Sequence, residues 1–460
     1  MKAPELLSPA GSLKHMRYAF AYGADAVYAG QPRYSLRVRN NDFNLENLGI
    51  GIAEAHALGK QFFVASNLMP HNAKVKTYMQ DMEPVIELGP DALIMADPGL
   101  ISMVRERWPE VPVHLSVQAN TVNYAAVKFW QSLGVSRVIL SRELGLDEIE
   151  EIRQLCPDMD LEVFVHGALC IAYSGRCLLS GYFNHRDPNQ GTCTNACRWE
   201  YSVHGAEEDV SGDAHKIEGK IEFDGMAAMN SPEIFPETQE VKRHPAADKV
   251  YLIEETNRPG QYMPIMEDEH GTYIMNSKDL RAIQYVERLA KMGIDSLKIE
   301  GRTKSHYYVA RTAQLYHQAI ADAVAGREFD ASLYSQLDSL ANRGYTPGFY
   351  ERHPDQATQN YLDNYSGSQQ QKFVGEVVNY NPDNGLASID VKNKFAVGDT
   401  LELIAPTGNQ TIKLDAMQDM QGNTMDVAPG GGYEVKIPLP AGDYERALLA
   451  VNMQAGGCGR

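Results

Sequence analysis

The sequence predicts an α/β fold: a (β/α)8 TIM-like barrel with a long cysteine-bearing insertion, followed by a small C-terminal β-barrel domain. Two observations carry this prediction. Over the first three hundred residues, a short apolar run, a polar tip and an amphipathic helix follow one another repeatedly. From about residue 371 the chain changes to short alternating runs separated by Gly, Asn and Asp turns. A length of 460 residues with 43% hydrophobic content is enough for two cores.

Eight apolar runs are expected to be the barrel strands. Strands that alternate with helices form a parallel sheet, and eight such units fit a closed barrel. An open doubly wound sheet is the alternative. It lacks support, because Pro9-Ala10-Gly11 follows the first run where a Gly-x-Gly-x-x-Gly fingerprint would be needed. The runs are Glu5–Ser8, Ala26–Ala29, Phe62–Ala65, Leu93–Ala96, Val113–Val117, Val138–Leu140, Glu162–Val165 and Leu297–Ile299.

The same patterns predict the helices and the domain limits. We expect the barrel to occupy residues 1–355, with the insertion around 166–280, a polar linker at 356–370 and the C-terminal domain at 371–460. Expected helices are Asn44–Leu58, Lys74–Leu88, Tyr124–Leu133, Leu146–Leu155 and Tyr307–Val324. Expected C-terminal strands are Val374–Val378, Leu386–Val391, Thr400–Leu403, Thr411–Leu414 and Tyr433–Ile437.

Charge and composition narrow the class of protein. With 42 Lys+Arg against 60 Asp+Glu, the net charge of −18 argues against a broadly basic surface that coats nucleic acid, although a local basic cleft can still bind phosphates. No stretch approaches the ~20 apolar residues of a membrane span, and the N-terminus does not resemble a signal peptide. We therefore expect a cytoplasmic protein without a membrane partner. The sequence leaves its oligomeric state open.

Four of the six cysteines lie within one short segment of the insertion, with the spacing Cys-x6-Cys-x15-Cys-x3-Cys. Four thiolates suit a [4Fe–4S] cluster. Zinc is the main rival, but structural zinc sites use pairs of tight knuckles and only one such pair occurs. Unrelated thiols or a disulfide remain the other alternative, and Glu200 stands where a radical-SAM motif would need a cysteine. The predicted ligands are Cys170, Cys177, Cys193 and Cys197.

Polar residues just after the predicted strands are the candidates for the active site, because barrel enzymes carry their chemistry at the carboxyl ends of the strands. Each of them also has a non-catalytic interpretation. The polar tips would form structural hydrogen bonds, the histidine would belong to the core, Glu300 and Arg302 would form an ion pair, and the basic loop would be solvated. The candidate catalytic residues are His166, Arg142, Glu143, Glu300, Arg302 and Lys304. The candidate substrate-binding residues are Arg33, Tyr34, Arg37, Asn67, His71, Gln118, Asn120 and Lys278, with Tyr34 expected to stack on a base.

Several of these segments resemble a known family. The stretch EVFVHGALCIAYSGRCLLS (Glu162–Ser180) is similar to the signature of the collagenase-like peptidases, a family of unknown peptidase type. The segments NSKDL, LKIEGR, ELLSPAG and ADAVYAGQPRYSLR extend the resemblance over nearly the whole chain. It is strongest to the branch that hydroxylates tRNA. One departure is Arg281, which stands where many relatives have a further cysteine, so the fourth ligand is either Cys197 or another group.

The resemblance implies a prephenate-dependent, oxygen-independent hydroxylation of the anticodon wobble uridine to 5-hydroxyuridine, with a [4Fe–4S] cluster. The implied partners are tRNA, prephenate as a small-molecule co-substrate and an electron donor for the cluster. Three alternatives remain: a peptidase, a hydroxylase of ribosomal RNA or ubiquinone, and a non-catalytic RNA-binding scaffold with a structural cluster. The peptidase reading has little support, because the chain has neither His-Glu-x-x-His nor Gly-x-Ser-x-Gly.

Overall fold

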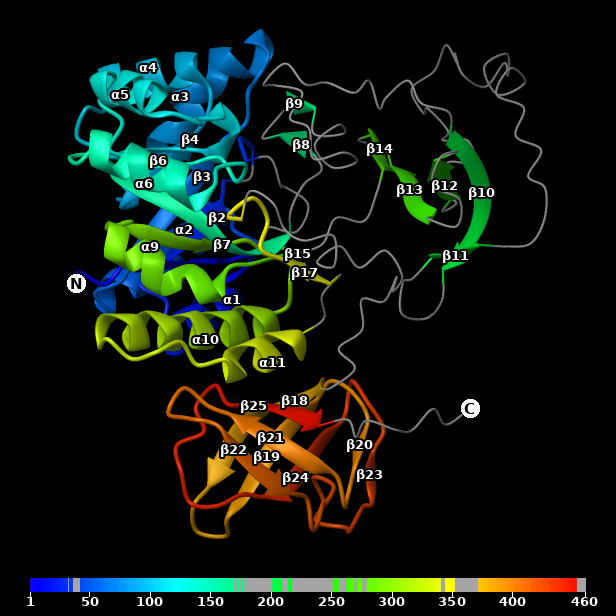
Figure 1. Ribbon diagram of the computed structural model, residues 1–460. Coiled ribbons are helices and arrows are strands. Elements are labelled where there is room, and N and C mark those ends of the chain that lie inside the picture. Colours follow the sequence, from blue (N-terminus) through cyan, green and yellow to red (C-terminus); the bar gives the residue numbers. More distant parts are fainter. Residues whose placement is uncertain are drawn as a thin grey trace, which may run out of the picture.

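The computed structural model of the chain is shown in Figure 1. It describes residues 1–31, 33–35, 42–168, 172–173, 176–177, 201–208, 214–216, 251–255, 262–268, 271–274, 279–340, 344–351 and 371–452. In these ranges no helix is long and apolar enough to cross a membrane.

Eight parallel strands close into a barrel. Seven consecutive strands pair in chain order, and the last strand, β16, pairs with both β1 and β7. This closed ring confirms the predicted barrel and excludes the open sheet. The strands are β1 (Glu5–Pro9), β2 (Ala26–Gly30), β3 (Gln61–Ser66), β4 (Ala92–Met95), β5 (Val113–Leu115), β6 (Arg137–Ile139), β7 (Asp160–Ala168) and β16 (Ser296–Ile299).

Helices cover the outside of the barrel (Figure 1). Several begin at a side chain that accepts a hydrogen bond from a backbone N–H of the first turn, for example at Ser12, Asp97 and Ser305. Each such cap stabilises its helix by about 1 kcal/mol. The helices are α1 (Leu13–Ala21), α2 (Leu45–Ala57), α3 (Asn72–Glu87), α4 (Pro98–Arg107), α5 (Tyr124–Ser132), α6 (Leu146–Leu155), α9 (Val286–Met292), α10 (His306–Val324) and α11 (Ser332–Asp338), with 3-10 turns η1 (Val117–Ala119) and η5 (Ile283–Tyr285).

The barrel interior contains a buried ion-pair network near its amino-terminal end. Lys298 Nζ lies 2.8 Å from the fully buried carboxylate of Glu162, and Arg137 Nη1 lies 3.3 Å from the same carboxylate and 2.7 Å from Glu5. Burial lowers the pKa of Lys298, while the charge of Glu162 opposes this. Each charge is compensated, so removal of one partner would leave a buried charge unpaired.

The insertion leaves β7 and returns to it. β15 (Asp279–Arg281) pairs antiparallel with the end of β7, with Asp279 opposite Ala168 and Arg281 opposite His166. β17 (Tyr345–Thr346) extends this edge. The described parts of the insertion are the two-stranded β8 (Ala172–Tyr173) and β9 (Arg176–Cys177), and a sheet ordered β11 (Ala214–Lys216), β10 (Tyr201–Glu208), β12 (Tyr251–Glu255), β13 (Tyr262–Asp268) and β14 (Gly271–Ile274).

The C-terminal domain is an antiparallel sheet with its own hydrophobic core, as the sequence predicts. The five predicted strands are present, but β25 was not predicted, although it lies between β21 and β18 in the sheet. In spatial order the sheet contains β22 (Gln410–Lys413), β21 (Thr400–Ile404), β25 (Leu448–Asn452), β18 (Gln371–Asn381), β19 (Leu386–Val391) and β24 (Glu434–Pro438), and the short strands β20 (Phe395–Ala396) and β23 (Val427–Ala428) pair separately.

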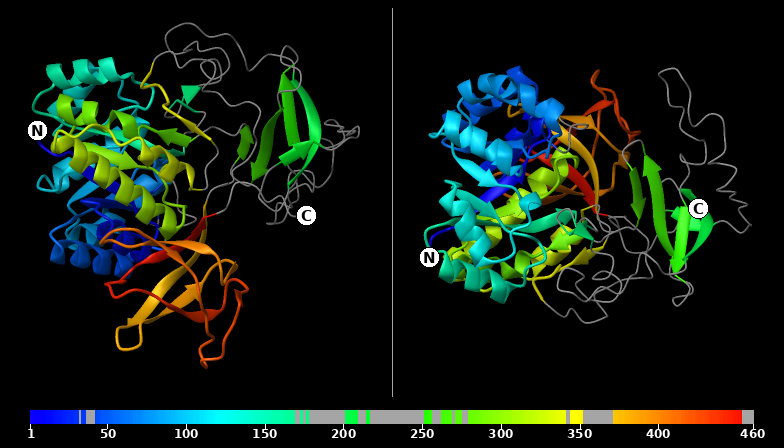
Figure 2. Two further views of the ribbon diagram at one scale, coloured as in Figure 1. Left: turned by 60° about the horizontal axis from the view of Figure 1, so that its bottom comes forward. Right: turned by 90° about the horizontal axis from the view of Figure 1, so that it is seen from above.

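The sheet domain packs against α1 and α10 of the barrel (Figure 2). The contact is centred on Glu376 of β18, whose carboxylate accepts hydrogen bonds from Lys14 Nζ at 2.7 Å and Tyr18 Oη at 3.0 Å. Lys392 Nζ lies 3.0 Å from the same carboxylate, and His306 Nε2 lies 3.4 Å from it. An acidic group therefore holds the two domains together through partners on both.

The Glu376 contact predicts a pH dependence of stability. Burial alone would raise the pKa of this carboxyl, but hydrogen bonds from His306, Lys14 and Lys392 outweigh it and hold the pKa far below 4.5. The unfolded chain takes up a proton near 4.5 and the folded chain does not, so the contribution is complete above that pH and is lost as pH falls. Thermal unfolding should show wild type more stable than Glu376→Gln at pH 7, with the difference shrinking below pH 4.5.

The control for this prediction is Glu434→Gln, at an exposed position of the same domain that forms no ion pair within the described ranges. It should leave the unfolding temperature unchanged at both pH values. An unchanged temperature for Glu376→Gln at pH 7 would contradict the assigned role of the carboxylate.

Candidate active site

Closure of the barrel brings Arg142, which follows β6, against Glu300, which follows β16. Arg142 Nη2 lies 3.3 Å from Glu300 Oε2, and its Nη1 donates to the carbonyl of Ala168 at 3.0 Å. The guanidinium carbon lies 3.8 Å from the ring centroid of Phe164, close enough for a cation–π contact. We call the carboxyl end of the barrel, where Arg142 and Glu300 lie, the mouth. Arg142 therefore connects the mouth with the end of β7, the strand that leads to the cysteines.

Arg302, two residues after Glu300, contacts β2 and the loop that follows it. Its Nη1 donates to Ser35 Oγ at 2.9 Å, and its guanidinium lies 5.8 Å from the ring centroid of Tyr28. Both Arg302 and Glu300 are 8% exposed. Two partly buried guanidinium groups, those of Arg142 and Arg302, therefore follow β6 and β16 at the carboxyl end of the barrel. A guanidinium is suited to a carboxylate or phosphate ligand.

Neutral polar groups follow the neighbouring strands. Asn67 after β3 donates to Ser116 Oγ at 3.3 Å, and Asn120 accepts from Ser141 Oγ at 3.1 Å. Asn120 has a φ of 58°, a left-handed conformation that asparagine tolerates better than most residues. Gln118 Oε1 is buried without a hydrogen-bond partner among the described residues. Glu143 is half-buried in the turn that carries Arg142.

His166 does not join this group. Its Nδ1 lies 3.3 Å from Tyr316 Oη, and its ring packs against Tyr308 and Tyr316 of α10 and Tyr345 of β17. The strand register shifts opposite His166, which turns the side chain toward the helix layer. Burial, then the charges of Arg281 and Lys304, lowers the pKa of His166 to about 3. The imidazole is therefore neutral and enclosed by tyrosines, which does not suit the catalytic role expected for His166.

The loop after β2 also differs from its prediction. Tyr34 was expected to stack on a base, but it is buried, its hydroxyl donates to Asp81 at 2.5 Å, and its ring meets Tyr78 edge to face. Arg33 is half exposed and lies 2.7 Å from Asp81. Tyr34 therefore anchors the loop to α3 and is not available to an RNA base.

The remaining predicted residues lie at the margin or outside the described ranges. His71 is exposed at the start of α3 and makes no side-chain cap there. Lys304 Nζ lies 3.9 Å from the carboxylate of Asp279 in β15. Arg37 and Lys278 lie outside the described residues.

Three of the four predicted cluster ligands, Cys170, Cys193 and Cys197, also lie outside the described residues, and Cys177 is described only through its backbone in β9. The hairpin pairs Cys177 with Ala172. Within the described ranges, no group of three or more His, Cys, Asp or Glu side chains is arranged to hold a metal ion. The assignment of the four cysteines to an iron–sulfur cluster stays a prediction from the sequence.

Arg281, which stands where many relatives of the resembled family have a cysteine, has a packing role. Its guanidinium lies 4.6 Å from the Tyr334 ring centroid and 4.8 Å from that of Tyr345, and it forms a 2.5 Å ion pair with Asp338. A guanidinium has no lone pair to offer a metal. The position therefore supports the aromatic layer beside His166.

The sequence patterns did not indicate Gly30 and Ser35 at the mouth, or Lys298 in the barrel interior. The alternation in LKIEGR does place Lys298 and Glu300 on one face of β16, so this signal could have indicated the interior lysine. Nothing local indicates that Ser35 meets Arg302, because the two are 267 residues apart in sequence.

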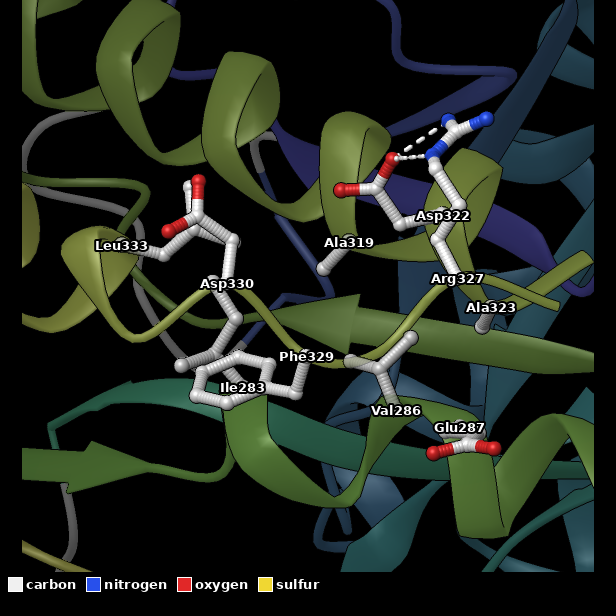
Figure 3. Close-up of a pocket in the computed structure, with 10 residues that line it drawn as sticks. All are labelled: Ile283, Val286, Glu287, Ala319, Asp322, Ala323, Arg327, Phe329, Asp330 and Leu333. Carbon is white, nitrogen blue, oxygen red and sulfur yellow. Dashed lines mark hydrogen bonds and ion pairs between the residues drawn. The ribbon is translucent and has the colours of Figure 1, made fainter. Parts of the chain in front are cut away.

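A separate surface depression of about 250 Å3 lies between η5, α9, α10 and the chain before α11 (Figure 3). Apolar side chains such as Ile283 and Phe329 form its floor, and the Arg327–Asp322 ion pair lies at its edge. Its lining comes from the helix layer, so it is not part of the barrel mouth.

The fold and the mouth define a two-domain barrel protein, and comparison with known proteins identifies its class. Residues 11–360 match the family described as Peptidase family U32, and residues 369–450 match the Peptidase family U32 C-terminal domain. The chain belongs to peptidase family U32, which confirms the collagenase-like resemblance.

Curated relatives match over the full length. The chain is 62% identical to tRNA hydroxylation protein P of Escherichia coli, over 98% of this chain and 97% of that protein. It is 58% identical to tRNA hydroxylation protein P of Haemophilus influenzae, over 98% and 96%. It is also 36% identical to a 23S rRNA 5-hydroxycytidine synthase of Escherichia coli, over 43% of this chain and 30% of that protein.

The enclosure of His166 gives a prediction at this site. Because its folded pKa is about 3 against 6.5 when unfolded, the imidazole stays neutral between pH 5 and 8, and nitrogen NMR should show no titration in that range. The unfolded chain binds the extra proton, so wild type should lose stability relative to His166→Phe as pH falls below 6.5. Titration of His166 near pH 6.5 would show that the ring is open to solvent.

Proposed function

We propose that this protein hydroxylates the anticodon wobble uridine of tRNA to 5-hydroxyuridine, in a prephenate-dependent, oxygen-independent reaction that uses a [4Fe–4S] cluster. The observation that carries the tRNA-hydroxylating activity is the similarity over the whole chain, both domains included, to two proteins named for tRNA hydroxylation. The similarity to an RNA hydroxycytidine synthase supports an RNA hydroxylase in the same family. Prephenate, the cluster and the wobble position rest on the family resemblance and the cysteine pattern.

In this proposal the barrel mouth binds both substrates. Arg142 and Arg302 bind carboxylates of prephenate, because a guanidinium holds a carboxylate through two parallel hydrogen bonds. The amide groups of Asn67, Gln118 and Asn120 offer donors and acceptors for the edge of a uracil. When bound by the four thiolates, a [4Fe–4S] cluster supplies one-electron chemistry to the site. Arg142 positions the end of β7, from which the cysteine segment leaves.

A local basic surface supports contact with RNA. It consists of Lys74 and Lys76 in the first turns of α3, with Arg33 of the loop after β2, which also pairs with Asp81. Residues 67–80 contain no acidic side chain, although the chain as a whole has 60 in 460 residues. Lys74 and Lys76 are exposed and form no ion pair within the described ranges, and Tyr34 joins the two loops by accepting from Leu68 N at its carbonyl. These charges suit the phosphates beside a nucleotide that enters the mouth.

No observation among the described residues favours a peptidase. The candidate base for a cysteine nucleophile would be His166, and its ring is enclosed by tyrosines. The alternative of a non-catalytic RNA-binding scaffold predicts instead that substitutions at the barrel mouth leave the tRNA modification intact.

The basic surface gives a binding prediction. The double variant Lys74→Ala/Lys76→Ala should weaken tRNA binding and reduce the slope of log affinity against log salt by about 1 per lysine that contacts a phosphate. The matched control is Lys394→Ala/Lys413→Ala, which removes the same charge from exposed positions of the C-terminal domain. Filter binding across a salt series measures both. A larger loss in the control pair would move the RNA contact to the sheet domain.

The activity is tested by deleting the gene in its host and measuring tRNA nucleosides by mass spectrometry. Under anoxic growth, 5-hydroxyuridine derivatives should fall, wild type should restore them, and Cys170→Ser and Arg302→Ala should not. Cys156→Ser is the control, because Cys156 is buried at the end of α6 and lies outside the predicted ligand set. Unchanged tRNA in the deletion, without oxygen and without a second enzyme of this activity, would contradict the proposal.

A further inference from the structure

A polar contact joins the loop after β2 to the segment that follows β16, the last strand of the barrel. Arg302 Nη1 donates to Ser35 Oγ at 2.9 Å, and both side chains are almost fully buried. A hydrogen bond from a charged donor in such surroundings is stronger than one between neutral groups. The contact therefore restrains the direction of the guanidinium.

The backbone of β2 is shaped to make room for this contact. A Cβ at Gly30 would lie 2.5 Å from Arg302 Nη1 and 2.9 Å from Ser35 Oγ, far closer than packed atoms approach. Gly30 has an ordinary backbone conformation, because it is not among the glycines of positive φ. Its missing side chain is thus required by the guanidinium, not by a turn.

The loop that carries Ser35 is itself fixed at two points. The side-chain oxygen of Gln31 accepts hydrogen bonds from the backbone N–H groups of Arg33 and Tyr34 at 2.8 and 2.7 Å. Tyr34 is in turn bonded through its hydroxyl to Asp81 of α3. Ser35 is therefore presented to Arg302 by a braced turn whose outer side carries Arg33 of the basic surface.

We infer that Ser35, with the space left by Gly30, is a positioning element that sets Arg302 for binding of a carboxylate co-substrate. This inference rests on the proposed function, in which Arg302 binds prephenate, and it adds residues that neither the sequence patterns nor the relatives' names indicate. Loss of the Ser35 hydroxyl removes one restraint on the Arg302 guanidinium, and the ligand must then order this side chain further on binding.

Calorimetric titration of prephenate into the purified full-length protein tests this. Ser35→Ala should weaken binding about tenfold, which corresponds to loss of one charged hydrogen bond. Ser35→Thr, which keeps the hydroxyl, should bind nearly as wild type. Gly30→Ala should weaken binding through displacement of Arg302, and it serves as the second variant if Ser35→Ala folds poorly. In turnover, the KM for prephenate should rise while kcat changes little.

The matched control is Ser66→Ala, which removes another buried hydroxyl at the end of β3 that bonds to Tyr78 instead of Arg302. It should leave the affinity for prephenate unchanged.

Arg302→Lys tests the ligand site separately from the positioning role of Ser35. If Arg302→Lys abolishes binding while Ser35→Ala and Gly30→Ala bind as wild type, the positioning role is wrong and the proposed ligand site stands. If Arg302→Lys binds as wild type, the proposed site falls and the inference with it.

Discussion

The pairing of β16 with β7 closes the barrel, and the ion pair between Lys298 and Glu162 crosses this seam inside it. Glu162 also meets Arg137 from β6, and Arg137 pairs with Glu5 of β1, so four neighbouring strands share one buried charge network. A charged interior contributes less to stability than an apolar one of equal packing would, but it penalises any register that leaves a charge unpaired. The direction in which β16 leaves the barrel follows from this register.

The mouth depends on that register. Glu300 and Arg302 follow β16 by one and three residues, so closure is what places them beside Arg142 after β6 and Ser35 after β2. Gly167 takes part in the same arrangement, because a Cβ there would lie 2.3 Å from the carbonyl of Glu300. The loops that form the candidate site are far apart in sequence. They meet because all the parallel strands of the barrel end on the same side.

The sequence predicts the elements well and the side-chain directions less well. Repeating apolar runs identify all eight barrel strands, since each is buried on both faces. The run Leu448–Asn452 forms β25, which was not among the predicted strands. Alternation along β7 would turn His166 inward with Glu162 and Phe164, but the register shift reverses it. Tyr34 was misplaced because its partner Asp81 lies 47 residues away, beyond any local pattern.

The account's central claim is that the target uridine enters the carboxyl-end mouth of the barrel. The most direct measurement is photo-crosslinking of the purified protein to an anticodon stem-loop that carries 4-thiouridine at the wobble position, with crosslinked peptides located by mass spectrometry. The account predicts crosslinks in the strand-end segments that carry Asn67, Gln118 and Asn120. Crosslinks confined to the C-terminal sheet domain, or to the helix layer around Phe329, would contradict it.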